Sequence, residues 1–511
     1  MNLTAWAQRQ PDKAAVIGPD GSTISYAELE RRSNQVAHVL RDLGLAAGDH
    51  LAIVSENRAD VLPLVWAAQR TGLLYTLVNW HLTAAEARYI VENCEARVLV
   101  ASAGVADIAA ALGSGLARVE RRLSFGGSME GYEPIEQLAD AAPTSPVEDE
   151  SEGYYMLYSS GTTGRPKGIL PELDATPFGT GLTIDHTMAD HFGFDAESVY
   201  LSPGPLYHAA PLGWTLGTIR NGGTAVLMDR FDAEDVLRLV ERHQVTHAQF
   251  VPTMFVRMLK LDAQVRREYD LSSLRLVVHA AAPCPVEVKR QMIEWLGPIV
   301  VEFYSGSEGV CFFMIDSASW LERPGSVGRS LRGSVHITGE DGTELPPGEI
   351  GQIWFGEVTP FAYHGDPDKT RAAYDAHGWV TLGDLGHLDE DGFLYLSDRR
   401  TDLIVSGGVN VYPREIEDAL ILHPAVADVA VVGLPDPEFG QRVHAVVAVA
   451  DGAVPDVALE QQLAADLRTR IAGFKIPRSW SFGEVPRLPS GKILRRVLME
   501  RFTTADEGRG L

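Results

Sequence analysis

The sequence predicts an α/β fold, and two observations lead to that prediction. Apolar runs of strand length alternate with helical patterns through the N-terminal half, which is typical of doubly wound sheets. From Gly333 the pattern changes to short β-like runs separated by Asp-Gly and Pro-Pro-Gly turns, which indicates a small antiparallel β subdomain. The charged stretch 398–402 indicates a linker to a small α+β domain, so we expect domains at 1–398 and 399–511.

The individual elements are predicted from apolar periodicity and capping residues. A helix is expected at 24–43, where Ser25 and Glu28 have the spacing of a capping box. No element is predicted for 170–194, which lacks a clear period. Further strands are expected at 50–54, 73–78, 96–100, 199–201, 224–228, 245–251, 276–278, 300–304, 335–337, 352–355, 393–396, 429–433 and 444–449, and helices at 59–70, 84–91, 233–243, 414–422 and 459–471.

Composition and charge exclude several classes of protein. A chain of 511 residues is too long for one compact core, so two or more domains are expected. The net charge of -25 argues against a general affinity for nucleic acid or anionic membranes. Three widely spaced cysteines and a polar stretch at 1–11 favour a reducing, cytoplasmic location. No apolar run approaches the roughly 18 residues that span a bilayer, so stable membrane insertion is not expected.

A stretch at 158–168 reads Tyr-Ser-Ser-Gly-Thr-Thr-Gly-Arg-Pro-Lys-Gly and directly follows the apolar run 154–157. Glycines let such a loop turn and expose its backbone N–H groups, while the hydroxyls and cations add further donors. These are the groups that cradle a polyphosphate. The loop is not a Walker A motif, because Pro166 and Lys167 follow Gly164 and Arg165. The alternative is a solvated connector.

Four predicted strands end in small, polar or turn residues. These ends are Pro-Gly-Pro-Leu-Tyr-His at 203–208, Pro-Thr at 252–253, His-Ala-Ala-Ala-Pro at 279–283 and Ser-Gly-Ser-Glu-Gly at 305–309. Ligands of open α/β sheets bind outside the carboxyl ends of the strands. The repetition therefore favours the phosphate interpretation of the loop at 158–168.

Two more motifs lie downstream, Thr-Leu-Gly-Asp at 381–384 and Pro-Ser-Gly-Lys-Ile-Leu-Arg at 489–495. With these motifs in this order, the chain resembles the acyl-adenylate-forming enzymes: acyl-CoA synthetases, aryl-CoA ligases, adenylation domains and luciferases. The similarity runs from about Tyr26 to Arg495, and the overall pattern is closest to actinobacterial fatty-acyl-CoA synthetases.

The resemblance implies a nucleotide site. Thr162, Thr163 and Lys167 would hold the β- and γ-phosphates of ATP. Tyr304 would stack on adenine, and Glu308 would hold Mg²⁺, a hard cation that prefers carboxylate oxygens. The implied ATP- and AMP-binding set is Ser159, Ser160, Gly161, Thr162, Thr163, Gly164, Lys167, Ala281, Ala282, Pro283, Tyr304, Ser305, Gly306, Ser307, Asp384 and Arg399.

The resemblance also implies catalytic and acyl-binding residues. Lys492 would bridge the substrate carboxylate and the α-phosphate, where a cation lowers the cost of bringing two anions together. His208 would orient the acid, so Lys492, His208 and Glu308 form the implied catalytic set. The acyl pocket would be lined by Tyr207, His208, Trp214, Thr253 and Ala280.

Two features of the C-terminal domain follow from the same resemblance. Ser406, Gly407 and Gly408 would shape the CoA tunnel. Thr401 would lie at the hinge about which a mobile small domain swings between two half-reactions. Thr401 stands where relatives commonly have Asp or Lys, and Val405 stands where many of them have Lys. Contacts to the CoA phosphates are therefore not assigned.

The implied function is an ATP- and Mg²⁺-dependent carboxylic acid–CoA ligase that forms acyl-AMP and then an acyl-CoA. A homodimer is compatible with the resemblance. Alternatives are a stand-alone adenylating enzyme that loads a carrier protein, a luciferase-type oxygenase and a non-catalytic homologue. Fatty, aromatic and alicyclic acids all remain open as substrates.

Overall fold

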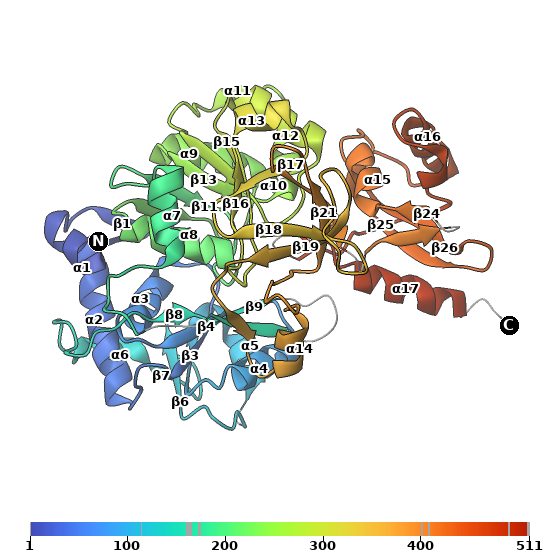
Figure 1. Ribbon diagram of the computed structural model, residues 1–511. Coiled ribbons are helices and arrows are strands. Elements are labelled where there is room, and N and C mark those ends of the chain that lie inside the picture. Colours follow the sequence, from blue (N-terminus) through green and yellow to red (C-terminus); the bar gives the residue numbers. More distant parts are fainter. Residues whose placement is uncertain are drawn as a thin grey trace.

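The computed structural model describes residues 2–113, 115–159, 166–171, 175–399, 402–406, 409–488 and 491–507. It confirms the predicted mixed α/β fold, with a large N-terminal domain and a smaller C-terminal one. In Figure 1 the large domain runs from blue to yellow, and the small domain, orange to red, lies beside it.

The first sheet of the large domain has six parallel strands. Its central strands are buried along their whole length, as expected for a parallel sheet covered by helices. In spatial order the strands are β7 (Glu133–Pro134), β6 (Arg121–Phe125), β5 (Val98–Ser102), β3 (His50–Val54), β4 (Leu74–Val78) and β8 (Tyr154–Tyr155).

The second sheet has 13 strands and is parallel from β1 to β15 apart from the edge strand β2. The short antiparallel strands predicted after Gly333 form, and they continue this sheet by hydrogen bonding. Its order is β18 (Ser334–Thr338), β19 (Gly351–Gly356), β21 (Asp384–Leu388), β22 (Leu394–Arg399), β17 (Ser326–Ser330), β16 (Phe313–Ile315), β15 (Val300–Tyr304), β14 (Leu276–His279), β13 (His247–Phe250), β11 (Val199–Ser202), β12 (Thr224–Leu227), β1 (Ala14–Ile17) and β2 (Thr23–Ser25).

Helices cover both sheets, and one large apolar cluster joins them. Tyr26, Trp66 and Trp214, all buried, come to this cluster from three different helices. The helices are α1 (Leu3–Arg9), α2 (Tyr26–Asp42), α3 (Leu62–Arg70), α4 (Ala84–Asn93), α5 (Ala106–Leu112), α6 (Ile135–Asp140), α7 (Thr183–Phe192), α8 (Ala209–Arg220), α9 (Ala233–His243), α10 (Pro252–Leu259), α11 (Val265–Glu268), α12 (Val286–Leu296) and α13 (Ser317–Glu322).

A buried ionic network ties α7 and α8 to the chain before β8. Arg220 donates to Glu152 and lies 3.1 Å from a carboxylate oxygen of Asp185. The three side chains are only 2%, 5% and 6% exposed. Burial raises the pKa of Asp185 to about 6, while the charge of Arg220 opposes that rise. The network therefore holds parts of the large domain that are distant in sequence.

A third, three-stranded sheet flanks the Gly-rich loop. Its strands are β9 (Leu157–Ser159), β10 (Lys167–Pro171) and β20 (Phe361–Tyr363), and α14 (Pro367–Ala372) follows β20. The residues that flank the loop pair antiparallel, with Lys167 opposite Ser159. The strands β9 and β10 are therefore the two arms of a hairpin.

The small domain contains the two helices and two strands predicted for it, which are α15 (Pro413–Leu420), β25 (Val426–Asp436), β26 (Gly440–Val449) and α16 (Val457–Arg468). It also contains four elements that were not predicted: β23 (Ile404–Ser406), β24 (Val409–Val411), β27 (Ser479–Phe482) and α17 (Arg495–Glu507). Among the described residues of the whole chain, no helix is both long and apolar enough to cross a membrane.

Candidate active-site cleft

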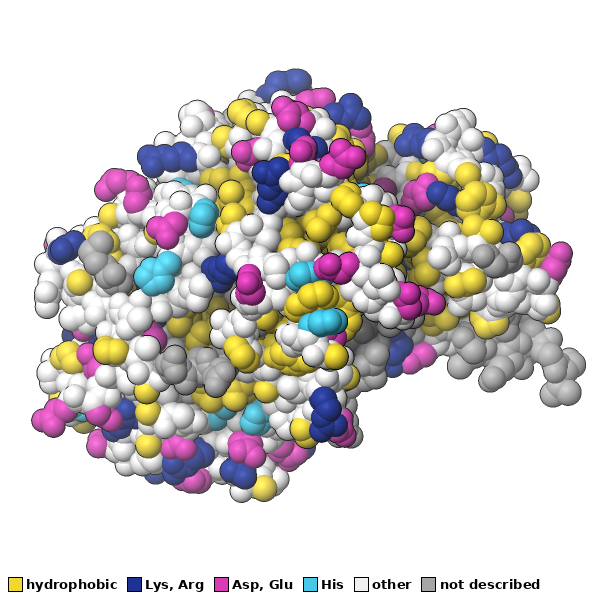
Figure 2. All heavy atoms as spheres, viewed as in Figure 1, with side chains coloured by type: hydrophobic (Ala, Val, Ile, Leu, Met, Phe, Trp, Pro, Cys, Tyr) yellow, Lys and Arg dark blue, Asp and Glu magenta, His cyan; other side chains and the backbone are white. Residues whose placement is uncertain are grey.

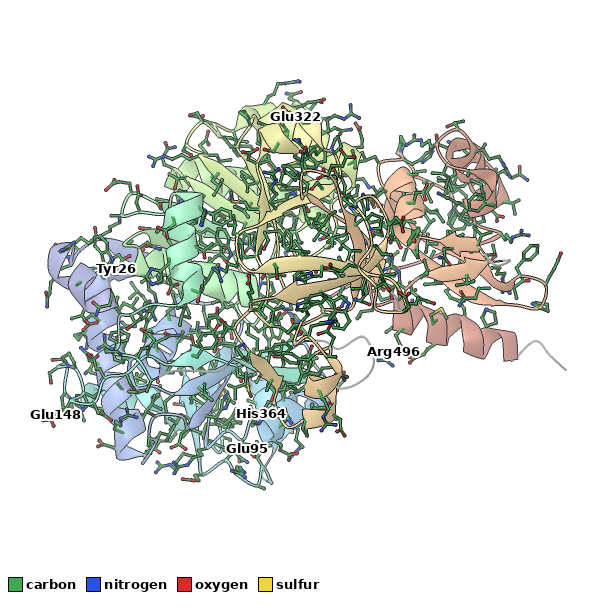
Figure 3. The ribbon with its side chains drawn as sticks, viewed as in Figure 1. Tyr26, Glu95, Glu148, Glu322, His364 and Arg496 are labelled. Carbon is green, nitrogen blue, oxygen red and sulfur yellow. The ribbon has the colours of Figure 1, made fainter. Side chains whose placement is uncertain are left out.

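A cleft of about 1610 Å³ lies where the two domains meet. Figure 2 shows hydrophobic side chains gathered along the hollow between them. Arg496, which lines the cleft, lies on the side of the small domain that faces the large one (Figure 3). The predicted site residues that line it are Lys167, Tyr207, His208, Trp214, Thr253, Ala280, Ala281, Ala282, Pro283, Tyr304, Ser305, Gly306, Ser307, Glu308, Asp384 and Lys492.

Lys167 lies at one end of the cleft beside a second lysine, Lys369 of α14. Its ammonium is 5.0 Å from the ring centroid of Tyr363. Burial, and next the positive charge of Lys369, lower the pKa of Lys167 to about 8. Two neighbouring ammonium groups repel each other, so this end of the cleft favours a polyanion.

Glu308 lies across from Lys167, and Tyr363 connects them. The hydroxyl of Tyr363 donates to Oε1 of Glu308 over 2.9 Å. Among the described residues there is no cluster of three His, Cys, Asp or Glu side chains that could hold a metal alone. A single carboxylate facing cations fits a Mg²⁺ that arrives on phosphates, because Mg²⁺ is commonly held by one or two carboxylates plus substrate.

Tyr304 and Asp384 form another part of the cleft lining. The hydroxyl of Tyr304 donates to Oδ2 of Asp384 over 2.6 Å, which fixes the carboxylate at the start of β21. Gln352 supports the same turn by donating to the backbone oxygen of Asp384 over 3.0 Å. Ala281 has a φ of 73°, a left-handed conformation that costs an L-residue about 1 kcal/mol. Such strain is typical of functional sites.

Tyr207 and His208 enter the cleft from the turn between β11 and α8. Asn57 holds this turn, because its Nδ2 donates to the Gly204 oxygen at 3.0 Å and its Oδ1 accepts from Leu206 N at 2.9 Å. Burial lowers the pKa of His208 to about 4, so the ring is neutral at physiological pH. Within the described part of the chain, its Nε2 has no hydrogen-bond partner, which leaves a polar atom available to a ligand.

A stack of three aromatic rings forms the wall next to these residues. Trp214 stacks on Phe303 with centroids 5.6 Å apart, and Phe303 stacks on Phe312 at 5.1 Å. All three rings are buried, and all three line the cleft. Thr253 and Ala280, the other two residues predicted for the acyl pocket, line the cleft just after the neighbouring strands β13 and β14.

The turn that carries Lys492 projects from the small domain to Thr253. Gly491 is buried with a φ of +81°, and a Cβ there would lie 2.9 Å from Oγ1 of Thr253. Arg487 holds the turn, since it donates to the Gly491 oxygen at 2.6 Å and pairs with Asp428 at 2.7 Å. The turn is therefore preorganised and directed at the large domain.

Two cations dock the small domain. Lys260 on the large domain donates to the Val426 oxygen at 2.6 Å. Arg414 on the small domain donates to the backbone oxygens of Leu396 and Cys284 at 3.1 and 3.4 Å. Across the domain boundary both cations bind backbone oxygens, and Arg414 also pairs with Asp418 of its own helix at 3.5 Å.

One predicted residue with a described side chain, Ser406, is not brought into the cleft, and others lie outside the described residues. Ser406 pairs with Val409 and Gly440 in the sheet of the small domain and is not among the lining residues. Arg399 lies opposite Asp384 in the sheet, so β22 extends into the region where we predicted the linker. Ser160, Gly161, Thr162, Thr163, Gly164, Thr401, Gly407 and Gly408 lie outside the described residues, as do the side chains of Ser159 and Arg399.

Sequence reasoning missed several residues at this site: Asn57, Gln352, Tyr363, Lys369 and Arg487. None lies within a motif that we used. The Pro-Asp-Lys sequence at 367–369 carried a weak signal, because a proline at a helix start places the lysine in the first turn.

Comparison with known proteins agrees with this geometry. The family model "AMP-binding enzyme" matches residues 3–361, and "AMP-binding enzyme C-terminal domain" matches 415–492. A fatty acid–[acyl-carrier-protein] ligase of Streptomyces coeruleorubidus is 32% identical over 97% of this chain and 95% of its own length. A feruloyl-CoA synthase of an Amycolatopsis species is 34% identical over 97% of both chains.

A solved structure of an anthranilate CoA ligase with bound anthranoyl-AMP has a TM-score of 0.85 and 25% identity, covering 99% of this chain and 98% of that one. These similarities run through both domains and agree with the expected acid–CoA ligase activity through an acyl adenylate. The chain belongs to the AMP-binding enzyme family.

Proposed function

We propose that this AMP-binding enzyme joins a carboxylic acid to CoA in two steps at the cleft between its domains. The carboxylate first attacks the α-phosphate of ATP, which gives acyl-AMP and releases pyrophosphate. The CoA thiol then attacks the acyl carbonyl, which gives the thioester and releases AMP. The pairing of a polyanion-favouring end, Lys167 and Lys369, with the Tyr304–Asp384 wall in one cleft is the observation that carries this proposal.

The residues of the cleft account for the first step mainly by positioning and charge. Lys167 would bind the leaving pyrophosphate, and Asp384 would accept the ribose hydroxyls, since a carboxylate offers two acceptor oxygens. Glu308 would hold the Mg²⁺ that neutralises phosphate charge. Lys492, delivered by the preorganised turn, would lie between the carboxylate and the α-phosphate.

The neutral ring of His208 would orient the acid. Its Nε2 can donate a hydrogen bond to a carboxylate oxygen when the proton is on that nitrogen, and burial keeps the ring from charging. We assign it no proton transfer, since neither step requires a nucleophilic side chain.

The acceptor has a second candidate, because one relative is named for acyl-carrier-protein. A carrier protein and CoA both present a thiol. AMP release with the preferred acid, measured with CoA and with a phosphopantetheinylated carrier protein, distinguishes them: only the true acceptor accelerates turnover.

The proposed function is tested by acid-dependent exchange of labelled pyrophosphate into ATP. K492A should reduce exchange by at least about a hundredfold, the scale seen when one transition-state donor is removed. K475A is a matched control, because Lys475 pairs with Glu415 elsewhere in the small domain at 2.5 Å. Unchanged exchange in K492A would refute the role of Lys492, and no exchange with any acid in the unmodified enzyme would refute the function.

A further inference from the structure

Arg332 lines the cleft from the turn between β17 and β18. Its side chain is half-buried, and its guanidinium carbon is 5.7 Å from the ring centroid of Phe312. Phe312 is the outer ring of the stack that continues through Phe303 to Trp214. The guanidinium is therefore part of the same wall that borders the predicted acyl pocket.

The guanidinium has few partners. Its Nη2 donates to the hydroxyl of Thr187, and that hydroxyl is held in place because it donates to the Thr183 oxygen at 2.8 Å. Among the described residues, no carboxylate forms an ion pair with Arg332. Burial alone lowers the pKa of Arg332. An arginine has five N–H donors, so most of its donor capacity is left to the cleft.

Other shielded arginines of the chain differ in this respect. Arg220 pairs with Glu152, Arg487 pairs with Asp428 at 2.7 Å, and Arg495 pairs with Glu417 at 2.7 Å. Withdrawing an unpaired cation from water is costly unless a partner compensates. Arg332 is thus a cation whose compensating anion is not supplied by the described protein groups around it.

The three stacked rings beside Arg332 offer it no oxygen acceptor, because their side chains are Phe312, Phe303 and Trp214. A substrate that ends in a methyl group would leave the guanidinium donors without an acceptor. A substrate that ends in an oxygen acceptor would satisfy them, and a carboxylate matches the planar fork of an arginine with two parallel hydrogen bonds.

We propose that Arg332 is a specificity-determining residue that selects acids carrying a second oxygen acceptor remote from the carboxylate that is activated, and that a carboxylate is preferred to a ketone there. This inference rests on the proposed function and names the substrate class of the same site. In this arrangement the aromatic stack contacts the body of the acid, and the guanidinium binds its far end.

The test compares acids that differ only at the far end. An aliphatic set is adipic acid, its methyl-ketone analogue and hexanoic acid; an aryl set is terephthalic acid, para-acetylbenzoic acid and para-toluic acid. Sets of other lengths cover the unknown distance between the two ends. Initial rates of pyrophosphate exchange give kcat/KM for each acid. In the best set we expect the dicarboxylic acid to exceed the methyl-ended acid by about tenfold to a hundredfold, the range for a charge-assisted hydrogen bond.

Two variants test whether Arg332 causes the preference. R332Q should lose it through a higher KM for the dicarboxylic acid, with little change for the methyl-ended acid. R329Q is the matched control, because Arg329 lies exposed on β17 over Phe393 and outside the cleft. A purely structural role would lower the rates for all acids together and leave the preference unchanged.

Equal or better activity with methyl-ended acids in the unmodified enzyme would overturn the inference, whether or not R332Q folds. A preference that survives in R332Q would also overturn it. If none of the acids in any set supports pyrophosphate exchange, the proposed function is refuted, and the inference with it. The two failures are therefore distinguishable.

Discussion

Gly491→Ala should weaken the docking of the turn that carries Lys492. The added Cβ would lie 2.9 Å from Oγ1 of Thr253 and 3.2 Å from Cγ2 of Val251, so one of these groups must move. The left-handed φ of +81° costs an alanine about 1 kcal/mol. This strain is the same whether or not the turn is docked on the large domain, so it does not itself weaken docking. We attribute a further ~1–2 kcal/mol to the contacts, which corresponds to about 5- to 30-fold slower adenylation.

The two half-reactions separate this effect from general damage. Pyrophosphate exchange reports adenylation, and thioester formation from a pre-formed acyl adenylate and CoA reports the second step. Because the small domain is expected to swing between the steps, G491A should slow the first far more than the second.

A double-mutant cycle with T253A tests the contact itself. T253A removes the oxygen at 2.9 Å and the methyl group at 3.6 Å from the new Cβ, so it should restore part of the lost exchange in the G491A background. The reasoning is refuted if G491A leaves exchange unchanged, or if T253A and G491A add independently.

Two further predictions concern the lysine pair and the ionic network. Lys167 is protonated below its pKa of about 8. The free enzyme should therefore bind ATP more weakly, with a higher Kd, as the pH rises through about 8. K369M removes the neighbouring positive charge, raises the pKa of Lys167 and should move this weakening to higher pH; titrations of ATP binding with an unmoved midpoint would contradict the coupling. R220M leaves two buried carboxylates without their cation and should lower the free energy of unfolding of the large domain by about 3–5 kcal/mol in chemical denaturation. R238M, which breaks the exposed pair with Asp235, should change it by less than about 1 kcal/mol, and equal effects would refute the assignment.

The fold was predictable where apolar periodicity and burial agree. The helix α9 is such a case, since its buried residues Val236, Leu237 and Val240 are all apolar. The strands β3 and β5 come close, because each buries a single polar residue, His50 or Ser102. The helix α7 was missed because its buried residues include Asp185 and Thr187, which disturb the apolar period. Asp185 is buried because Arg220 lies opposite it, and that partner comes from another helix.

The cleft was predictable only to the extent that its residues lie in contiguous motifs. Tyr304, Asp384 and Lys167 each lie within or directly beside a motif that is recognisable in the sequence. Asn57 does not, because the turn it holds lies 147 residues away at Gly204. Arg332 shows the same limit, since an isolated arginine gains meaning only when its surroundings prove to contain no carboxylate partner among the described residues.

The continuity of the 13-stranded sheet has a consequence for the order in which products leave. The Tyr304–Asp384 wall belongs to that sheet, whereas Lys167 belongs to the separate sheet of β9, β10 and β20. The hydrogen bond from Tyr363 to Glu308 connects the two bodies across the cleft. In the proposed function, the nucleoside and the diphosphate would therefore be held by two different sheets. The sheet of β9, β10 and β20 would release pyrophosphate while the 13-stranded sheet still retains the adenylate for its second reaction.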